Sequence, residues 1–394
     1  MKINIFETFA GIGSQSKALN NLKKKYKDFD FEVAYLSEWY IEAIIAYSAI
    51  HNNQKSKKYL EYYNENINII KDFLKTKNFS SNSKDPIKDI LKFKEEKLRK
   101  IYASVKINNN LVDITTINGE KLKRKIDLLT YSFPCQDLSI AGKGLGMERN
   151  SNTRSGLLWH IERILSELNS FKNLPKYLLM ENVTAIKNSK HIKNLEEFKI
   201  ILKKMGYTSK DFILSASDFG LPQDRKRYFL ISKLEDSNFD IFPKTKILIK
   251  KFKDYLKVDE MKVSNRNEIY IKSIKNKIKL EKLENPLSIK FKNLGVYPTF
   301  NQANIVTGIE RKTISTITFS GENSRQRVLI KENNKFIVKQ LGPRENVLLM
   351  GFDKSDFNKM KRADISNEKI RGLAGNSIAV NILEAIFEEL FILK

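Results

Sequence analysis

Residues 2–24 read KINIFETFAGIGSQSKALNNLKK, and this stretch contains the pattern that decides the fold class. The apolar run at 2–9 predicts a β-strand, the letters AGIG follow as a glycine turn, and residues 14–24 have helical spacing. A second strand-like run at 31–38 follows, and apolar residues on one face then predict a helix that begins near residue 41. Strand, glycine turn, helix and strand in this order are typical of a ligand-binding unit in an open α/β sheet.

Apolar runs alternate with helical patterns further along the chain. Strands are expected at 125–133, 176–183 and 227–233, and helices at 156–168 and 195–207. Strands that alternate with helices place the crossover helices on both faces of a sheet. The sequence therefore predicts an α/β fold with a mainly parallel, doubly wound sheet.

Two segments interrupt this alternation and suggest the domain organisation. Residues 52–110 are rich in Lys and Asn, and we expect a surface insertion in which one amphipathic helix packs on the body of the first domain, 1–240. The region 241–340 is basic and contains short β-like pieces, including a hairpin at 327–340, which predicts a second, smaller domain. The last segment, 341–394, is helix-forming and is expected to return to the first domain.

The composition limits the class of protein and its partners. The net charge is +25, from 71 Lys and Arg against 46 Asp and Glu, which favours a polyanionic partner; genome-wide A+T bias is an alternative explanation. One cysteine allows no internal disulfide and no cysteine-based metal cage, so we expect no metal site and a reducing, cytoplasmic location. No run approaches the roughly 20 apolar residues that span a membrane.

The glycine turn and the end of the second strand form a predicted nucleoside site. Gly11 and Gly13 let the backbone approach a ligand, and Glu38, about 25 residues on, is placed to bind ribose hydroxyls. Trp39 offers a flat surface for an adenine. Ser16 replaces the third glycine of the dinucleotide pattern, and no basic residue is available for a pyrophosphate. S-adenosylmethionine therefore fits better than NAD, with an ordinary tight turn as the alternative.

The only cysteine, Cys135, lies in YSFPCQDLS at 131–139, directly after an expected strand. It should lie at the carboxyl edge of the sheet, where open α/β folds bind ligands. A lone cysteine is most often a small buried apolar residue. Here, however, Pro134 fixes the backbone before it, and the glycine-containing loop 136–154 follows, which is able to act as a lid. This setting favours a nucleophile.

Polar residues also stand at the ends of two later strands. Glu181 and Asn182 end an apolar run, where burial would raise the pKa of the Glu181 carboxyl and suit it to act as a general acid. Gln223, Arg225 and Arg227 occupy alternate positions at the start of the next strand, which predicts that they share one face. Such a polar face on a core strand needs partners.

Together these motifs resemble those of the bacterial DNA (cytosine-5)-methyltransferases of restriction–modification systems. The matching elements follow the order of that family: FAGIG at 9–13, EW at 38–39, PCQ at 134–136, ENV at 181–183, QDRKR at 223–227 and GNSI at 375–378. Each element is short, but the ordered set is specific. The resemblance implies the S-adenosylmethionine-dependent methyltransferase fold, with 241–340 as the target-recognition domain.

The resemblance also implies a role for each residue of the catalytic set. The Cys135 thiolate would add to C6 of a flipped-out cytosine, and a protonated Glu181 would hold N3. Arg225 would reach O2 and stabilise the charge that develops on the ring. Asn182 would shape the pocket, and Arg227 would orient its neighbours. C5 would then take the methyl group, and loss of the C5 proton would release the cysteine.

Further residues are assigned to the cofactor and to DNA by the same resemblance. The expected cofactor contacts are Phe9, Gly11, Ile12, Glu38, Trp39, Asp113, Pro134, Leu157, Asn376 and Ser377, with Asp113 on the adenine amino group. The expected DNA contacts are Gln136, Arg154, Gln223, Thr316, Ser320, Asn323, Arg325 and Arg327. Gln136 would lie near the space that the flipped base vacates, and Arg154 on a phosphate.

The expected substrate is double-stranded DNA, bound by a monomer, and any cognate restriction endonuclease would act separately. The two-base site CG is our first guess for the target. Alternatives are the tRNA-methylating branch of the family, a non-catalytic DNA-binding relative and, more remotely, a nicotinamide-dependent oxidoreductase. The basic second domain favours DNA over tRNA, and the intact Cys, Glu and Arg set argues for catalysis.

Overall fold

The structure, a computed structural model, describes residues 2–134, 146–149, 154–247, 250–274, 296–297, 306–309, 311–318, 326–333 and 335–393. The chain forms two compact units. Unit 1 comprises Met1–Leu214, Lys226–Lys244 and Ile382–Lys394, and unit 2 comprises Ser215–Arg225 and Thr245–Asn381. This division differs from the boundaries expected from the sequence, because 215–225 and 341–381 belong to unit 2.

Unit 1 is built around a six-stranded sheet with the order β2-β1-β3-β4-β7-β5. Its strands are β1 (Lys2–Thr8), β2 (Asp30–Ser37), β3 (Leu128–Tyr131), β4 (Tyr177–Asn182), β5 (Tyr207–Ser215) and β7 (Lys226–Leu234). Parallel pairing joins β1 to β2 and β3, and β3 to β4, whereas β7 runs antiparallel to β4. The prediction of a mainly parallel α/β sheet is confirmed, although β5 was not predicted.

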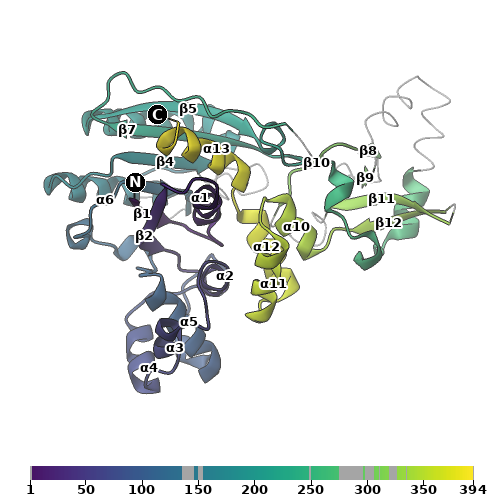
Figure 1. Ribbon diagram of the computed structural model, residues 1–394, viewed down its shortest axis with the longest axis horizontal. Helices are drawn as coiled ribbons and strands as arrows, with labels where there is room; N and C mark the ends of the chain where they lie inside the picture. The colour runs from purple at the N-terminus through teal and green to yellow at the C-terminus, as the bar shows by residue number, and fades with distance from the viewer. Residues whose placement is uncertain are drawn as a thin grey trace. The chain divides into compact units, whose positions relative to one another are not determined.

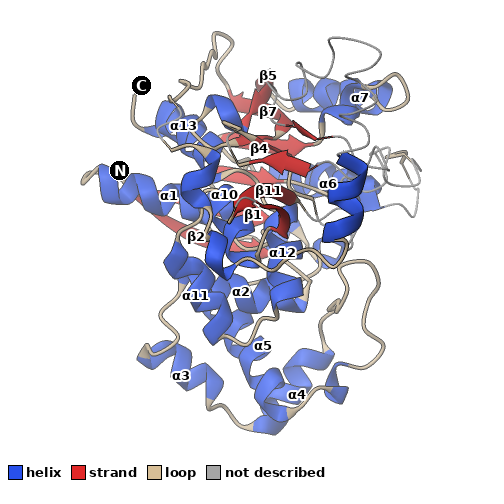
Figure 2. Ribbon diagram, turned by 90° about the vertical axis from the view of Figure 1, so that its right-hand side faces the viewer, coloured by secondary structure: helices blue, strands red, loops and turns tan. Residues whose placement is uncertain are grey.

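Helices cover both faces of this sheet. They are α1 (Ser14–Lys25), α2 (Ile41–His51), α6 (Leu158–Ser170), α7 (Ile192–Lys204) and α13 (Val380–Phe391). Figure 2 shows α1 and α13 on one side and α6 and α7 on the other. Every residue of β3 and β4 is buried, as expected for central strands covered on both faces. Near the end of the chain, the ring of Phe391 packs on Phe29 and Tyr177.

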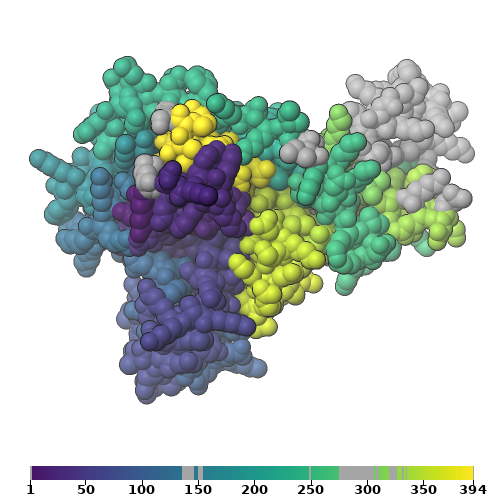
Figure 3. All heavy atoms as spheres, viewed as in Figure 1, coloured from purple at the N-terminus to yellow at the C-terminus, as the bar shows by residue number. Residues whose placement is uncertain are grey.

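The insertion at 52–110 forms a group of helices at one end of unit 1. They are α3 (Lys57–Tyr63), α4 (Ile67–Lys75) and α5 (Glu95–Ile107). Helix α5 packs on α2, α3 and α4, and Tyr102 of α5 meets Phe73 of α4 edge to face. In the space-filling view these residues gather in one lobe (Figure 3). The predicted amphipathic helix is confirmed for its second part, α5, which begins at Glu95, whereas the apolar residues from Ile87 to Leu91 lie before it and α3 and α4 were not predicted.

Unit 2 contains short strands and three helices whose two ends are both described (Figure 1), and residues 267–274 are helical as well. The strands are β6 (Gln223–Asp224), β8 (Val296–Tyr297), β9 (Val306–Gly308), β10 (Ile314–Ser315), β11 (Arg327–Glu332) and β12 (Lys335–Gln340), and the helices are α10 (Pro343–Leu349), α11 (Lys354–Arg362) and α12 (Asn367–Asn376). The predicted hairpin is confirmed as the antiparallel pair β11–β12. Strand β10 pairs with β6.

Short 3₁₀ turns connect these elements. They are η1 (Ile90–Lys92), η2 (Ile114–Thr116), η3 (Gly119–Lys121), η4 (Arg154–Leu157), η5 (Thr184–Lys187), η6 (Ala216–Asp218), η7 (Phe252–Tyr255) and η8 (Val258–Glu260). Two of them lie next to predicted site residues: η2 directly follows Asp113, and η4 begins at Arg154, the last residue of the predicted lid. Over the described part of the chain, every helix is too short or too polar to cross a membrane.

Candidate active site

The turn between β1 and α1 has an unusual backbone. Phe9, Gly11 and Gly13 all have positive φ, at 52°, 56° and 78°. A Cβ on Gly13 would lie 2.3 Å from Nε2 of His51, so only glycine fits there. Among the described residues, a Cβ on Gly11 would meet nothing within 4 Å, so Gly11 supplies the left-handed conformation. Over this part of the chain, the turn thus has one packed side and one open side.

Glu38, directly after β2, holds this turn from the side. Its Oε2 accepts from the Gly11 N–H at 2.8 Å, and its Oε1 accepts from the Tyr40 N–H at 2.8 Å. Burial raises the pKa of Glu38, and hydrogen bonds from the backbone N–H groups of Tyr40, Gly11 and Trp39 oppose that effect. A carboxylate has about four acceptor positions, so among the described residues one remains for a ligand. A hydroxyl, as on a ribose, would fill it.

Asn110, at the end of the insertion, fixes the backbone of Glu38 and was not predicted. Its Oδ1 accepts from the Glu38 N–H at 3.1 Å, and its Nδ2 donates to the Glu38 carbonyl at 2.9 Å. The side chain is buried. One asparagine in an Asn-rich segment carries no sequence signal, so this role emerges only from the folded chain.

The other cofactor residues predicted in unit 1 lie along the same edge of the sheet. Strands β1 to β4 are parallel neighbours, so their carboxyl ends meet there. Ile12 is buried, whereas Phe9, Trp39 and Asp113 are half-buried. The Asp113 carboxylate caps η2 by accepting from the backbone and hydroxyl of Thr115. Phe9 and Leu157 pack against the hydrophobic core.

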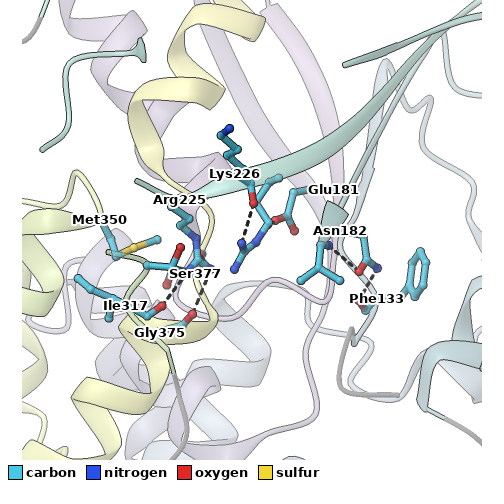
Figure 4. A network of polar contacts seen from close by, with 12 residues as sticks. Phe133, Glu181, Asn182, Arg225, Lys226, Ile317, Met350, Gly375 and Ser377 are labelled. Atoms are coloured by element: carbon cyan, nitrogen blue, oxygen red, sulfur yellow. Dashed lines mark hydrogen bonds and ion pairs between the residues drawn. The ribbon is translucent and has the colours of Figure 1, made fainter. Parts of the chain in front are cut away.

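The main chain directly before Cys135 is anchored at two points. The Phe133 carbonyl accepts from Nδ2 of Asn182 at 3.1 Å, as Figure 4 shows. The Pro134 carbonyl accepts from Oγ of Ser155 at 2.8 Å. Both side chains are buried. Asn182 and the unpredicted Ser155 therefore fix the approach to Cys135, which itself lies outside the described residues.

Glu181 pairs with an arginine at the carboxyl end of β4. Its Oε1 lies 3.3 Å from Nε of Arg227 on β7, and the two side chains are only 11% and 15% exposed. The antiparallel pairing of β4 and β7 brings the two residues together, since Glu181 is opposite Phe229 and Asn182 is opposite Tyr228. Partial burial strengthens the attraction between opposite charges. The pair places a carboxyl group and a guanidinium beside Asn182.

Arg225 has a different environment, within unit 2. Its buried guanidinium donates to the carbonyl oxygens of Ile317 at 2.8 Å, Gly375 at 3.1 Å and Ser377 at 2.8 Å (Figure 4). These bonds join the chain after β10 to the chain after α12. The expected contact of Arg225 with the base does not follow from this geometry, because the guanidinium is directed at the main chain.

Known proteins with similar sequences identify the family. A model of the C-5 cytosine-specific DNA methylases matches residues 82–392. The chain belongs to this family. The methylase is 38% identical, over 397 aligned positions, to the orphan methyltransferase M.SssI of Spiroplasma monobiae, covering 99% of this chain and 97% of the relative. It is 34% identical to the type II methyltransferase M2.ScrFI of Lactococcus lactis subsp. cremoris, covering 99% of each.

Solved structures show the same fold. The methylase resembles the Dnmt2 methyltransferase of S. pombe with a TM-score of 0.61 at 17% identity, over 98% of this chain and 97% of the other. The methyltransferase EhMeth of Entamoeba histolytica gives 0.59 at 19% identity, over 99% and 98%. The family, the α/β fold and the enzyme class expected from the sequence are confirmed: the protein is a C-5 cytosine-specific DNA methyltransferase.

Gln223, which was expected to contact DNA, is fully buried in the methylase. Its Nε2 donates to the Leu349 carbonyl at 2.8 Å, and its Oε1 accepts from the Ile317 N–H at 2.9 Å. The Arg225 N–H donates to the Gln223 carbonyl at 2.9 Å, which closes a tight turn between β6 and β7. This turn interrupts the strand, so Gln223, Arg225 and Arg227 do not continue along one face as predicted.

Two other expected DNA contacts also bond within unit 2. The Thr316 hydroxyl donates to the Asp224 carbonyl at 2.9 Å. Arg327 is buried, with its guanidinium 4.8 Å from the centre of the Tyr270 ring. A buried arginine stacked on an aromatic ring stabilises the β-rich domain. In this structure Arg327 therefore contacts Tyr270, and the expected contact with a DNA groove is not seen.

The remaining predicted site residues divide between the two units. Arg154 begins η4 in unit 1 and is half-buried. In unit 2, Asn376 ends α12 and is exposed, while the buried Ser377 donates its hydroxyl to the Leu373 carbonyl at 2.8 Å. Gln136, Ser320, Asn323 and Arg325 lie outside the described residues.

Part of the predicted lid, 136–154, is described and is fixed to the body of unit 1. Nε1 of Trp159 donates to the carbonyl of the buried Met147 at 2.8 Å. Arg149 lies 3.9 Å from the Trp159 ring centre and forms ion pairs with Glu162 and Glu197. Helices α6 and α7 thus anchor residues 146–149 in this conformation.

Proposed function

We propose that the methylase transfers the methyl group of S-adenosylmethionine to C5 of a flipped-out cytosine in double-stranded DNA, at a short specific sequence, through a covalent bond between Cys135 and C6. One observation carries this proposal: the Glu181–Arg227 pair stands beside Asn182, whose amide anchors the chain two residues before Cys135. An acid, a cation and a thiol at adjoining strand ends suit an addition to a cytosine ring.

The residues around the glycine turn fit S-adenosylmethionine. The open acceptor position of Glu38 suits a ribose hydroxyl, and the space beside Gly11 admits a close ligand. Trp39 offers a flat face for the adenine. When bound, S-adenosylmethionine supplies an electrophilic methyl group on a positively charged sulfur. The turn contains no basic residue that could bind a phosphate, and S-adenosylmethionine is a nucleoside without phosphates.

The chain's own residues would carry the addition and elimination. Sγ of Cys135 forms a bond to C6, the C5–C6 π bond breaks, and its electron pair becomes available at C5. Because Glu181 is ion-paired with Arg227 in the free protein, it would take up a proton when the base binds and then donate that proton to N3 as negative charge spreads over the ring. After methylation, C5 loses its proton to solvent, the C5–C6 double bond forms again, and the thiolate leaves. The proton on N3 returns to Glu181.

We assign the contact with O2 of the base to Arg227 in place of Arg225. Arg227 belongs to the same unit as Glu181 and pairs with it, whereas the guanidinium of Arg225 donates to main-chain carbonyls. A cation beside the acid can stabilise charge on the same edge of the ring, which carries both N3 and O2. Arg225 then acts on the stability of unit 2.

Bisulfite sequencing tests the proposal. Unmethylated plasmid DNA is incubated with the purified protein and S-adenosylmethionine, and a reaction without cofactor is the control. Protection of cytosines within one recurring short sequence would support the chemistry, the DNA substrate and sequence specificity together. No protected cytosine, with cofactor binding confirmed by calorimetry, would contradict the proposal, and a matching assay on tRNA would then test the other branch of the family.

We further propose that the methylase acts on DNA as a monomer and that its net charge of +25 contributes to phosphate binding. The relatives include an orphan methyltransferase and a type II methyltransferase by name. Methylation of DNA requires no endonuclease, whether the methyltransferase is an orphan or belongs to a type II system. We therefore infer that any cognate restriction enzyme acts separately.

A further inference from the structure

A short segment of the insertion returns from the helical lobe to the cofactor side of the sheet. The Ser80 N–H donates to the Trp39 carbonyl at 2.9 Å, and the Ile41 N–H donates to the Ser80 carbonyl at 2.9 Å. These bonds make a parallel bridge between Tyr40 and Ser80. Phe79 and Ser80 are 2% and 0% exposed. Phe79 and Ser80 are therefore built into the body of unit 1 beside Trp39, and the exposed side chain of Asn78 directly precedes them.

The same segment contacts Asp113, the residue expected at the adenine amino group. Nδ2 of Asn78 donates to Oδ2 of Asp113 at 2.9 Å. On the other side, Oδ1 of Asp113 accepts from both the backbone and the hydroxyl of Thr115. Since each carboxylate oxygen has about two acceptor positions, Oδ1 is filled, and Oδ2 keeps one position as far as the described residues go. Asn78 and Thr115 together fix the rotation of the carboxylate.

We propose that residues 78–80 form part of the cofactor site, with Asn78 as a positioning residue that directs Oδ2 of Asp113 toward the adenine amino group. This inference rests on the proposed use of S-adenosylmethionine. It gives the insertion a function in the reaction: one end, Asn110, fixes Glu38 for the ribose, and its middle, Asn78, fixes Asp113 for the base. The two asparagines hold two neighbouring carboxylates.

The inference predicts discrimination between two ligands that differ at one group. S-adenosylhomocysteine carries the 6-amino group, and S-inosylhomocysteine carries an oxygen in its place. Asn78→Ala should weaken the affinity for S-adenosylhomocysteine about fivefold, the effect of about one hydrogen bond, and leave that for S-inosylhomocysteine unchanged. Asn78→Asp should weaken it further, because two carboxylates would repel each other. Calorimetry measures both affinities.

Asn68→Ala is the matched control, because Asn68 is exposed on α4 of the same insertion. The KM for S-adenosylmethionine should rise in Asn78→Ala, with kcat unchanged at saturating cofactor. An equal loss of affinity for both ligands would overturn the positioning role, since it would indicate a general disturbance of the site. Unchanged affinities would overturn it too. A wild-type protein that binds neither adenosyl ligand would instead overturn the proposed cofactor.

Discussion

Two sets of polar side chains differ in their hydrogen-bond partners. The first set lies at the strand ends of unit 1, and the second lies around β6 in unit 2. In unit 1, Glu38 accepts from three backbone N–H groups and, among the described residues, keeps one acceptor position, and Glu181 pairs with Arg227 at 3.3 Å. In unit 2, Gln223 and Arg225 are buried and direct their side chains at main-chain groups. The first set can therefore bind a ligand, and the second set stabilises the fold of unit 2.

The difference shows that one sequence motif can contain both residues that stabilise the fold and residues that face a ligand. Within QDRKR, Gln223 and Arg225 belong to unit 2 and stabilise it, whereas Arg227 belongs to unit 1 and lies beside the proposed general acid. Substitutions in the first set should therefore change the free energy of unfolding, and substitutions in the second set should change the rate of methyl transfer.

The largest effect is expected from Cys135→Ala. Methyl transfer should fall by about ten-thousandfold or more, because no other group in the chain offers a thiolate for C6. Incorporation of tritiated methyl groups into DNA measures the rate. DNA affinity, measured by gel shift, should stay the same. Turnover at a rate near that of the wild type would remove the thiol from the mechanism.

Glu181→Gln should lower kcat about a thousandfold, since an amide cannot give its proton to N3. The free energy of unfolding should change little, which places Glu181 in the ligand-facing set. Single-turnover kinetics and urea unfolding measure the two quantities. A wild-type kcat would show that protonation of N3 is not the role of Glu181.

Arg225→Met should lower the free energy of unfolding by about 3 kcal/mol, because it leaves buried carbonyls of Ile317, Gly375 and Ser377 without that donor. Lys226→Met, at the exposed neighbouring position, is the control. Urea unfolding measures both. If Arg225→Met were as stable as the wild type and lost activity, Arg225 would belong with the catalytic set, and the comparison between the units would fail.

A smaller effect is expected from Glu7, beneath the glycine turn. Burial raises the pKa of this carboxyl to about 7, and hydrogen bonds from Ser16 and Tyr47 oppose the rise. Among the described residues, its Oε1 has no hydrogen-bond partner. Ionisation therefore costs more in the folded chain than in the unfolded chain, where the pKa is near 4.5.

The folded state binds more protons than the unfolded state between these two pKa values, so stability should fall as the pH rises. From pH 5 to pH 8 the contribution of Glu7 should drop by about 2 kcal/mol. Glu7→Gln has no proton to lose and should flatten this part of the profile. Urea unfolding at several pH values measures it, and parallel profiles for the two proteins would contradict the assignment.

The sheet was largely predictable, and the exceptions have physical reasons. Apolar runs predict β1, β3 and β4 because central parallel strands are buried on both faces. Strand β5 was missed because it lies at the edge of the sheet, where the exposed Lys210 and Asp211 interrupt any apolar pattern. Helices α3 and α4 are short, at 7 and 9 residues, and depend on packing against α5.

The sequence by itself determined the fold class, the family and the strand ends at which the site lies, because buried strands and ordered motifs are local and need no partner to be recognised. Only the tertiary structure decided which polar residue bonds to which. Arg225 and Arg227 are two residues apart, yet they belong to different units because the chain turns after β6. Asn78 and Asn110 reach Asp113 and Glu38 only because the insertion folds back, and a hydrogen bond between distant residues leaves no periodic trace in the chain.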